Sequence, residues 1–585
     1  MAILAICFAS IGFAQALLAQ GPDLSTDFFD TVDVNIVNVE VYVTDKKGNP
    51  VTGLGPEDFE VLEDGQGVEV TNFYASESGR PTTASDSDPT APTSAPGEAA
   101  AKPKDQRLNL VIFVDNQNIT PQSRNRVIDA IRGSLFFQLN PDDRVLLVSY
   151  DGQVNVRQGL TGDPELLAEA LDGLVTGSSR GVHQGLDRTS ILRELQQLDL
   201  EADAGGAVGG LANDVTDVLA EDVLSSIRTY TQSRFREIVL TTEVLGRFVS
   251  SLAGLEGRKA LIYISDGMAL RPGEALFDAW RAKVQEISPT TSVAGIESEA
   301  RDSDATPLFE NLGRHANANA VTFYTILAGG NSNQALSPAE RGAFFSLNSP
   351  SSLGQVWTDR LEAIERSNIR GSLQIMAEAT GGLATTETNA IGRALQRLKR
   401  DLDTYYSLGY KPPSNDNENH KIKVRMKDPS LKVRHRESYR NKTADEAMSD
   451  RTLSALLFEG SGENPLGIRI EFGESRKDSN GQIVVPVLVK FPIAKVLLLP
   501  QEHFHEGRVS IYVGAMDSSG GTSPIQKMPA PIRIPNDQLL TALGQVAGFR
   551  MTLVMKEEEH EVVVGVRDEL GNVESTAKVS HTPGL

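Results

Sequence analysis

Apolar positions are most strongly patterned along residues 107–411. Residues 108–114 form a continuous apolar run, which is typical of a strand buried on both faces. From Pro121 the apolar residues recur at helical spacing, and strand and helix patterns then alternate through the apolar runs at 261–264 and 321–327. This order predicts an α/β fold of the doubly wound type, with a mainly parallel sheet.

The segments on either side of this region have the period-two pattern of strands. Apolar residues alternate along 32–74, with a change of parity between Ile36 and Val37 that indicates a bulge or an edge crossing. Residues 446–585 are also β-rich, and they end in a predicted hairpin between 561–567 and 573–579. We therefore expect β-sandwich-like domains at both ends of the chain.

Two changes in composition mark boundaries, as expected for a chain of 585 residues. The first twenty residues are apolar, and residues 77–106 consist largely of Ser, Thr, Pro, Ala, Gly and Asp without apolar periodicity. The predicted organisation is a signal peptide at 1–20, an N-terminal β domain at 22–76, a disordered linker at 77–106, the α/β domain with insertions at 107–445, and a C-terminal β-sandwich-like domain at 446–585.

The first twenty residues predict secretion or residence in the periplasm or cell envelope. The triplet 14–16 has the small residues of a signal-peptidase site, although no Lys or Arg precedes the apolar run, which leaves open a start further upstream. The single cysteine, Cys7, lies in this segment, so the processed chain would contain no disulfide. No later stretch has the ~18 apolar residues of a membrane helix.

The chain is acidic, with a formal net charge of −22, which disfavours non-specific binding to nucleic acid. One strand-like segment, at 421–436, departs from this balance because basic residues alternate along it. This pattern indicates either a solvated face or a docking surface for an acidic protein or extracellular polymer. The residues expected at that surface are Lys421, Lys423, Arg425, Arg434 and Arg436.

Two carboxylates follow predicted buried strands. Asp115 ends the run at 108–114, and Asp266 follows the run at 261–264. The carboxyl ends of parallel strands meet at one edge of the sheet, where ligands bind near the switch in strand order. Paired acids at this edge suit a hard divalent cation such as Mg²⁺ or Ca²⁺. The alternative is structural, with Asp115 capping a helix start and Asp266 fixing a turn with Gly267.

These features together resemble a known family. The run at 111–115, the strand with Ser265-Asp266-Gly267 and the order of helices are similar to a von Willebrand factor A (VWA) domain. The flanking segments at 43–65 and 405–410 resemble the VWA-related proteins secreted by acidobacteria. The resemblance spans most of residues 32–440, and it implies the VWA-type sheet between β-sandwich domains.

The resemblance also implies a metal-ion-dependent adhesion site, which in VWA domains has an Asp-x-Ser-x-Ser loop, a threonine and a second aspartate. In this chain Gln117 and Ile119 occupy the two serine positions, so two hydroxyl ligands are absent. The remaining candidate ligands are an amide oxygen and a threonine that lies beyond an insertion rich in Gly, Ser and Arg. The residues expected at this degenerate site are Asp115, Asn118, Thr189 and Asp266.

The sequence contains none of the contiguous motifs of a serine hydrolase, a phosphate-binding loop, a zinc protease or a dinucleotide-binding enzyme. We therefore expect a secreted or envelope-associated module for protein interaction or adhesion, and no enzymatic activity. Two alternatives remain: an envelope hydrolase or carbohydrate-active enzyme that uses the two rim carboxylates, and a structural scaffold that assembles with itself.

Overall fold

The computed structural model contains two compact units. The larger comprises Ile36–Ser250 and Gly257–Asn441, and the smaller is formed mainly by Lys442–Leu585. The predicted signal peptide and most of the predicted linker lie outside the described residues. These are residues 36–77, 80–82, 106–134, 140, 142–175, 187–198, 212–287, 293–329, 352–386, 391–414, 416–458, 462–477, 483–518 and 521–584.

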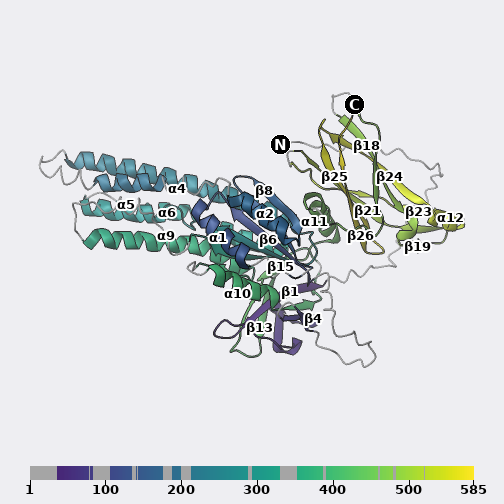
Figure 1. The fold of residues 1–585 in the computed structure, drawn as a ribbon, viewed down its shortest axis with the longest axis horizontal. Coiled ribbons are helices and arrows are strands. Elements are labelled where there is room, and N and C mark those ends of the chain that lie inside the picture. The colour runs from purple at the N-terminus through teal and green to yellow at the C-terminus, as the bar shows by residue number, and fades with distance from the viewer. Residues whose placement is uncertain are drawn as a thin grey trace. The chain divides into compact units, whose positions relative to one another are not determined.

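A six-stranded sheet forms the centre of the larger unit (Figure 1). Its strands are β6 (Leu108–Asp115), β7 (Arg144–Tyr150), β8 (Val154–Thr161), β9 (Arg258–Ser265), β10 (Val321–Leu327) and β11 (Ala384–Thr385). They lie in the order β11-β10-β9-β6-β7-β8, and only the edge strand β8 is antiparallel to its neighbour. The sheet is therefore mainly parallel, and the chain order switches between β6 and β9.

Helices cover this sheet. As a result, every residue of β6, β9 and β10 is buried. One face packs against α1 (Pro121–Ser134), α2 (Pro164–Val175) and α10 (Ile391–Asp403). The apolar residues of α1 that the sequence pattern singled out, including Val127 and Ile131, are fully buried in this core. The continuous apolar runs thus form strands that are buried on both faces.

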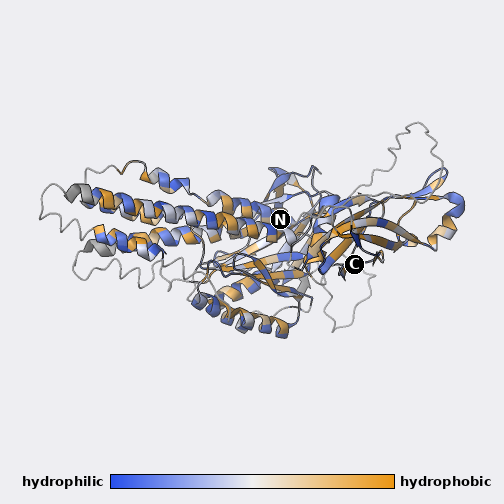
Figure 2. Ribbon diagram, turned by 90° about the horizontal axis from the view of Figure 1, so that it is seen from above, coloured by the Kyte–Doolittle hydropathy of each residue, from blue (hydrophilic) through white to orange (hydrophobic). Residues whose placement is uncertain are grey.

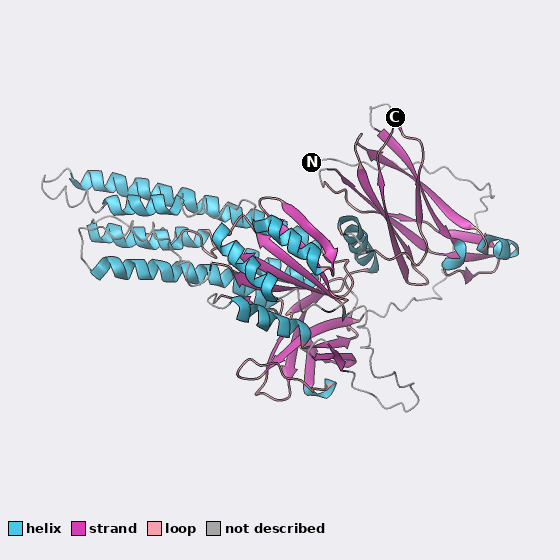
Figure 3. Cartoon of the chain, viewed as in Figure 1, coloured by secondary structure: helices cyan, strands magenta, loops and turns pink. Residues whose placement is uncertain are grey.

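Long helices extend beyond the sheet side by side (Figures 1 and 3). The helices beside the sheet are α4 (Ala212–Ser251), α5 (Glu274–Ile287), α6 (Ile296–Asp302), α7 (Thr306–Ala318) and α9 (Ser352–Ala379). α4 has 40 residues, which corresponds to about 60 Å. Hydrophobic and hydrophilic positions interleave along these helices (Figure 2), and their shared core includes Trp280, whose Nε1 donates to the carbonyl of Ala220 at 2.7 Å. No helix in the described part of the chain is long and apolar enough to cross a membrane.

Two further sheets of the larger unit share one apolar core. Their strands are β1 (Val37–Thr44), β2 (Phe59–Glu63), β3 (Gln66–Val68), β4 (Val70–Glu77), β5 (Arg80–Thr82), β12 (Tyr405–Tyr410), β13 (Asn419–Met426), β14 (Lys432–His435) and β15 (Ser438–Arg440). The sheet orders are β14-β1-β12-β4-β5 and β15-β13-β2-β3. Strands from the predicted N-terminal domain therefore pair with strands from the end of the predicted α/β domain. β5 lies within the stretch predicted as a linker.

The smaller unit is mostly β-structure around one core. Its strands are β16 (Arg469–Phe472), β17 (Arg476–Lys477), β18 (Ile483–Pro492), β19 (Leu499–Pro500), β20 (Phe504–Gly507), β21 (Val509–Asp517), β22 (Gln526–Pro529), β23 (Ile532–Pro535), β24 (Val546–Met555), β25 (His560–Asp568) and β26 (Val573–His581). Its helices are α11 (Ala444–Leu457) and α12 (Leu539–Leu543). β25 and β26 form an antiparallel pair, as expected for the predicted hairpin.

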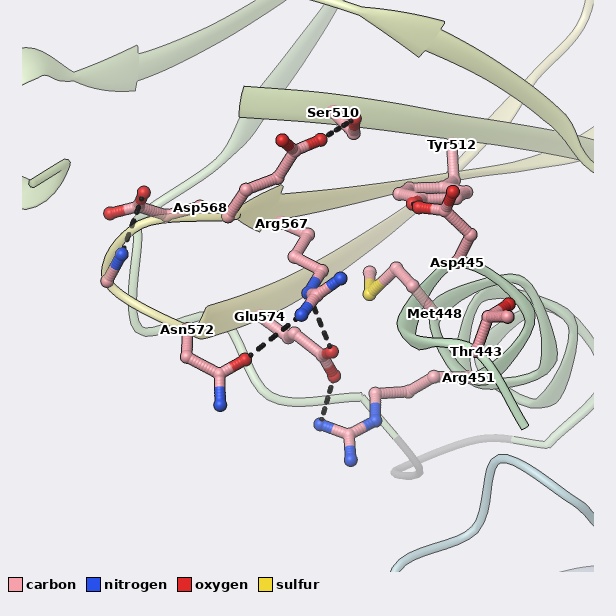
Figure 4. A network of polar contacts seen from close by, with 12 residues as sticks. Thr443, Asp445, Met448, Arg451, Ser510, Tyr512, Arg567, Asp568, Asn572 and Glu574 are labelled. Carbon is pink, nitrogen blue, oxygen red and sulfur yellow. Dashed lines mark hydrogen bonds and ion pairs between the residues drawn. The ribbon is translucent and has the colours of Figure 1, made fainter. Parts of the chain in front are cut away.

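A polar network holds α11 against the sheet of this unit (Figure 4). The hydroxyl of Tyr512 donates to Asp445 at 2.6 Å, at the start of α11. Glu574 on β26 pairs with Arg451 of α11 at 2.7 Å and with Arg567 of β25 at 3.5 Å. Each of these charges has a partner within the unit, so the network serves to position the helix.

Candidate functional site

Asp115 lies at the carboxyl end of β6, at the switch in strand order, and is fully buried. Its Oδ1 accepts hydrogen bonds from the backbone N–H groups of Gln117 and Asn118, both at 3.1 Å. Its Oδ2 accepts from the Asn118 side chain at 2.9 Å, from the Tyr263 hydroxyl at 2.5 Å and from the Ser265 hydroxyl at 3.4 Å. Burial raises the pKa of Asp115, and the hydrogen bonds oppose that shift. Donors of the chain itself thus surround this carboxylate.

Asn118 joins the two loops that follow β6 and β9. Its carbonyl oxygen accepts from the backbone N–H of Asp266 at 2.8 Å and from the Ser265 hydroxyl at 3.1 Å, whose single proton is shared between this carbonyl and Asp115. Its side-chain amide donates to Asp115, as described above. The residue is buried, so its polar groups position the rim of the sheet.

Asp266 holds the residue that precedes α1. Its Oδ2 accepts from the backbone N–H of Thr120 at 2.8 Å, immediately before Pro121 begins the helix. Its Oδ1 is buried and accepts no hydrogen bond within the described residues. Burial raises the pKa of Asp266 to about 6, although the Thr120 N–H acts in the opposite direction. The capping role that the sequence suggested for Asp115 is instead performed by Thr120, whose hydroxyl accepts from the backbone N–H of Ser123 at 3.4 Å.

Thr189 lies in a different environment. It is buried in the helical stretch at 187–198, where Ile191 and Leu192 belong to the apolar core shared with α4, α5 and α9. The structure therefore brings Asp115, Asn118 and Asp266 together at the rim and places Thr189 among the helices.

Three of the predicted basic residues share one exposed face. Lys421, Lys423 and Arg425 are exposed on β13, in alternation with buried residues, and we call them the basic strip. Arg425 lies 3.6 Å from Glu60 on the neighbouring strand β2, and both side chains are exposed. Such an exposed pair adds little stability to the fold.

The other two predicted basic residues, Arg434 and Arg436, are engaged within the fold. The guanidinium of Arg434 donates to both carboxylate oxygens of Asp401, at 2.8 and 2.7 Å, and to the carbonyl of Gly381 at 2.9 Å. Arg436 donates to the carbonyl of Asn38 at 2.7 Å. These contacts position strands and helices, so neither residue belongs to the basic strip.

A hollow of about 530 Å³ lies between α9 and the segment that precedes α5. Its polar lining includes Arg271, Glu274 and Asn368. Arg271 pairs with Asp304 at 3.2 Å and with Glu274 at 3.3 Å, and the Asn368 amide donates to Glu274 at 2.8 Å. These polar groups are satisfied by one another, so the hollow does not indicate a particular ligand.

A second group of carboxylates, which sequence reasoning did not single out, surrounds His420 on β13. The imidazole Nδ1 lies 2.8 Å from Asp64 Oδ2 and 3.6 Å from Glu63 Oε1, and Nε2 lies 2.9 Å from Asp416 Oδ1. Tyr439 donates its hydroxyl to Glu63 Oε2 at 3.1 Å and stacks on the imidazole. We call Glu63, Asp64, Asp416 and His420 the His420 cluster.

The electrostatics of this cluster follow from the contacts. Burial alone would lower the pKa of His420, but hydrogen bonds to Asp64 and Asp416 raise it above its ordinary value. The hydrogen bond to His420 lowers the pKa of Asp416 to about 2. The backbone N–H of Lys421 and the imidazole together lower the pKa of Asp64. Two features of the sequence point to residues of this cluster: the Glu-Asp-Gly turn at 63–65, and the strand alternation that places His420 on the buried face of β13. Neither feature shows that the turn and the strand lie next to each other.

Comparisons with known proteins leave the family open. No protein-family model and no curated protein matches the chain. The structural-genomics target SoR45 is 15% identical over 21% of this chain and 91% of that one, with a TM-score of 0.15. A β-glucuronidase from Bacteroides uniformis is 12% identical over 31% of this chain and 19% of that one, with a TM-score of 0.13.

A third solved structure contains the three N-terminal domains of the type V pili tip protein Mfa5 from Porphyromonas gingivalis. It is 9% identical to this chain and covers 91% of it and 78% of that chain, with a TM-score of 0.21. At these TM-scores the similarities establish neither a shared fold nor a shared activity. The function therefore has to be argued from the residues.

Proposed function

We propose that this protein is a secreted or envelope-associated interaction module, built on a VWA-type domain, that binds a protein or extracellular polymer without catalysing a reaction. In this proposal the degenerate adhesion site holds no cation. The observation that carries it is the environment of Asp115, whose two oxygens accept four hydrogen bonds from the chain itself, with the Ser265 hydroxyl a further 3.4 Å away.

The topology supports the VWA-type assignment. Numbered from one to six along the chain, the strands lie in the sheet in the order 3-2-1-4-5-6, with the third strand antiparallel at one edge. Asp115 follows the first strand and Asp266 follows the fourth, which are the neighbours at the switch point. This is the place where doubly wound sheets bind ligands.

The donor set around the two acids disfavours a cation. A hard divalent cation needs several converging oxygens without competing protons. At this rim a cation would have to displace the Tyr263 hydroxyl and the Asn118 amide from Asp115. Asp266 alone offers one buried oxygen, because its other oxygen accepts from the backbone N–H of Thr120.

The same rim gives no support to catalysis. Asp115 is enclosed by donors of the chain, so its carboxylate is not placed to act on a substrate. The basic strip is exposed, and its positive charge in a chain of net charge −22 supports it as the surface that binds a partner. An acidic protein or anionic polymer would be attracted there.

The full chain, immobilised, would be used to capture partners from culture medium and envelope fractions, and the affinity for a purified partner would then be measured in EDTA and in Mg²⁺. We expect the same Kd in both conditions. The variant Lys421→Ser/Lys423→Ser/Arg425→Ser should weaken binding at least tenfold. The matched control, Arg469→Ser/Arg476→Ser/Lys477→Ser, removes three other exposed charges and should have no effect.

Two results would overturn the proposal. One is a tenfold or greater dependence of the affinity on Mg²⁺. The other is turnover of an envelope polymer by the wild-type protein that Asp266→Asn abolishes.

A further inference from the structure

We propose that the His420 cluster is a binding site for a divalent cation of the Zn²⁺ class, with His420 Nδ1, Glu63 and Asp64 as ligands and Asp416 as a positioning residue. The cluster lies in the β-sandwich part of the larger unit, and the inference is independent of the proposed function. It begins from the convergence of one imidazole nitrogen and two carboxylates, whose ligand atoms all lie within 4.8 Å of one another.

The distances are those of a small coordination shell. Zn²⁺ binds nitrogen and oxygen ligands at about 2.0–2.2 Å, so two ligands of a tetrahedral site lie about 3.3 Å apart. Nδ1 of His420 is 2.8 Å from Asp64 and 3.6 Å from Glu63, which brackets that separation. The imidazole is therefore placed so that a cation can replace the proton between it and the two carboxylates.

The orientation of the ring is set from its other side. Nε2 of His420 lies 2.9 Å from Asp416, so that carboxylate can hold the proton of the imidazole on Nε2 and leave the lone pair of Nδ1 toward Glu63 and Asp64. A carboxylate behind a histidine ligand is the usual support in zinc sites. The Tyr439 hydroxyl fixes Glu63 in the same way, through its Oε2 at 3.1 Å.

The charges in the cluster are unbalanced without a cation. Three carboxylates face one imidazole, so the group is negative even when His420 is protonated. Glu63 is only 3% exposed, and among the described residues its ion-pair partner is His420, at 3.6 Å. A buried carboxylate with such partial compensation is costly, and a divalent cation supplies the missing charge.

The chemistry favours Zn²⁺ over Mg²⁺ or Ca²⁺. An imidazole nitrogen suits the borderline transition metals, whereas the hard cations prefer oxygen alone. The side chain of Asp64 is 53% exposed, so one side of the site is open to water, which would complete the coordination. The open side also gives the cation a path of entry.

The test is titration of the metal-free full chain with ZnCl₂ at neutral pH, with calorimetry and a competing chelator to measure affinity and stoichiometry. We expect one high-affinity Zn²⁺ per chain, and no binding of Mg²⁺ or Ca²⁺ at this site. His420→Ala and the isosteric Glu63→Gln should each weaken Zn²⁺ binding at least a hundredfold. Tryptophan emission checks that both variants remain folded.

Two control variants and one positioning variant sharpen the result. Asp428→Asn removes an exposed aspartate from the same β-structure, and His505→Ala removes a half-buried histidine of the smaller unit; neither should change the affinity. Asp416→Asn should weaken binding about tenfold to a hundredfold while the visible spectrum of bound Co²⁺ stays the same, because its ligands are unchanged. A purely structural role of Asp416 would not produce that combination.

The proposal is overturned if Zn²⁺ does not bind, or if it binds equally well to Glu63→Gln and His420→Ala. The contacts would then describe a protonated imidazole held between two aspartates. Preference for Ca²⁺ over Zn²⁺ at this site would overturn it as well.

Discussion

The rim of the parallel sheet and the His420 cluster both contain several carboxylates, but the carboxylates have different hydrogen-bond partners at the two places. At the rim, Asp115 accepts hydrogen bonds from two backbone N–H groups, an amide and two hydroxyls, which are neutral donors. In the His420 cluster the carboxylates converge on one imidazole, and Asp64 remains half-exposed. The first arrangement is closed by the chain, and the second is open to a cation.

The difference shows that the position of an acid in a fold does not decide its role. Asp115 and Asp266 occupy the strand ends at which a doubly wound sheet binds ligands, yet their oxygens are used in holding the rim loops together. The inventory of donors around each carboxylate is the better guide. Four perturbations of the rim and of the basic strip test this comparison.

The largest effect is expected from Asp115→Ala. The substitution leaves the side chains of Asn118 and Tyr263 without their buried acceptor, so unfolding should become easier by about 4 kcal/mol. Urea unfolding followed by tryptophan emission measures this, because Trp280 and Trp357, the chain's two tryptophans, lie in the larger unit. A loss below about 1 kcal/mol would mean that the donors find other partners and that the rim is less closed than we infer.

The next effect concerns Asp266 and pH. Its pKa in the folded protein, about 6, lies above its ordinary value of 3.8, so the folded state retains a proton that the unfolded chain releases between these pH values. This contribution to stability is therefore complete below pH 4 and is lost as the pH rises to about 6, by roughly 3 kcal/mol in total. The difference in unfolding free energy between wild type and Asp266→Asn should follow that curve. A difference that is flat with pH would contradict the assignment.

Tyr263→Phe removes a single donor from Asp115. We expect a loss of about 2 kcal/mol, because a hydrogen bond to a buried carboxylate is worth more than one between neutral groups. Mg²⁺ should not restore this stability, since the amide and backbone donors still surround the carboxylate. Stabilisation of this variant by Mg²⁺, and not of the wild type, would show that the hydroxyl alone excludes a cation.

The smallest effect is expected at the basic strip. Its three side chains are exposed on β13, on the opposite face from His420, so their joint replacement by serine should change stability by no more than about 0.5 kcal/mol. Zn²⁺ affinity should change less than threefold. A larger change would mean that the two faces of β13 are coupled and that the His420 cluster depends on the charge of the strip.

The sequence predicted the parts of the fold that depend on local pattern. The apolar run before Asp115 became a strand buried on both faces, and the helical spacing after Pro121 became α1. The alternation at Lys421 and Lys423 placed both on one exposed face. These outcomes follow from periodicities of 2 and 3.6 residues, which a short stretch of sequence already contains.

The rest depends on contacts between distant segments. His420 meets Asp64 across 356 residues, and nothing in either segment specifies the other. The same holds for Arg434, which alternates with Lys432 and Arg436 in the sequence but forms an ion pair with Asp401 on α10. Hydrogen-bond donors such as Tyr263, which occupies an ordinary position in an apolar strand, reach Asp115 only after the sheet has formed. The sequence pattern therefore predicts where the acids lie, but it does not predict which donors form hydrogen bonds with them.

The pairing of β1 with β12 has a consequence for the order of synthesis. On a ribosome adding about 5–20 residues per second, the strand that contains Val41 waits tens of seconds for its partner Tyr406, because roughly 350 residues must be translated in between. Throughout that interval its valines and its backbone groups lack their final neighbours, and unpaired strands of this kind tend to aggregate. We therefore expect the nascent chain to depend on chaperones until the second half of the sheet has been made.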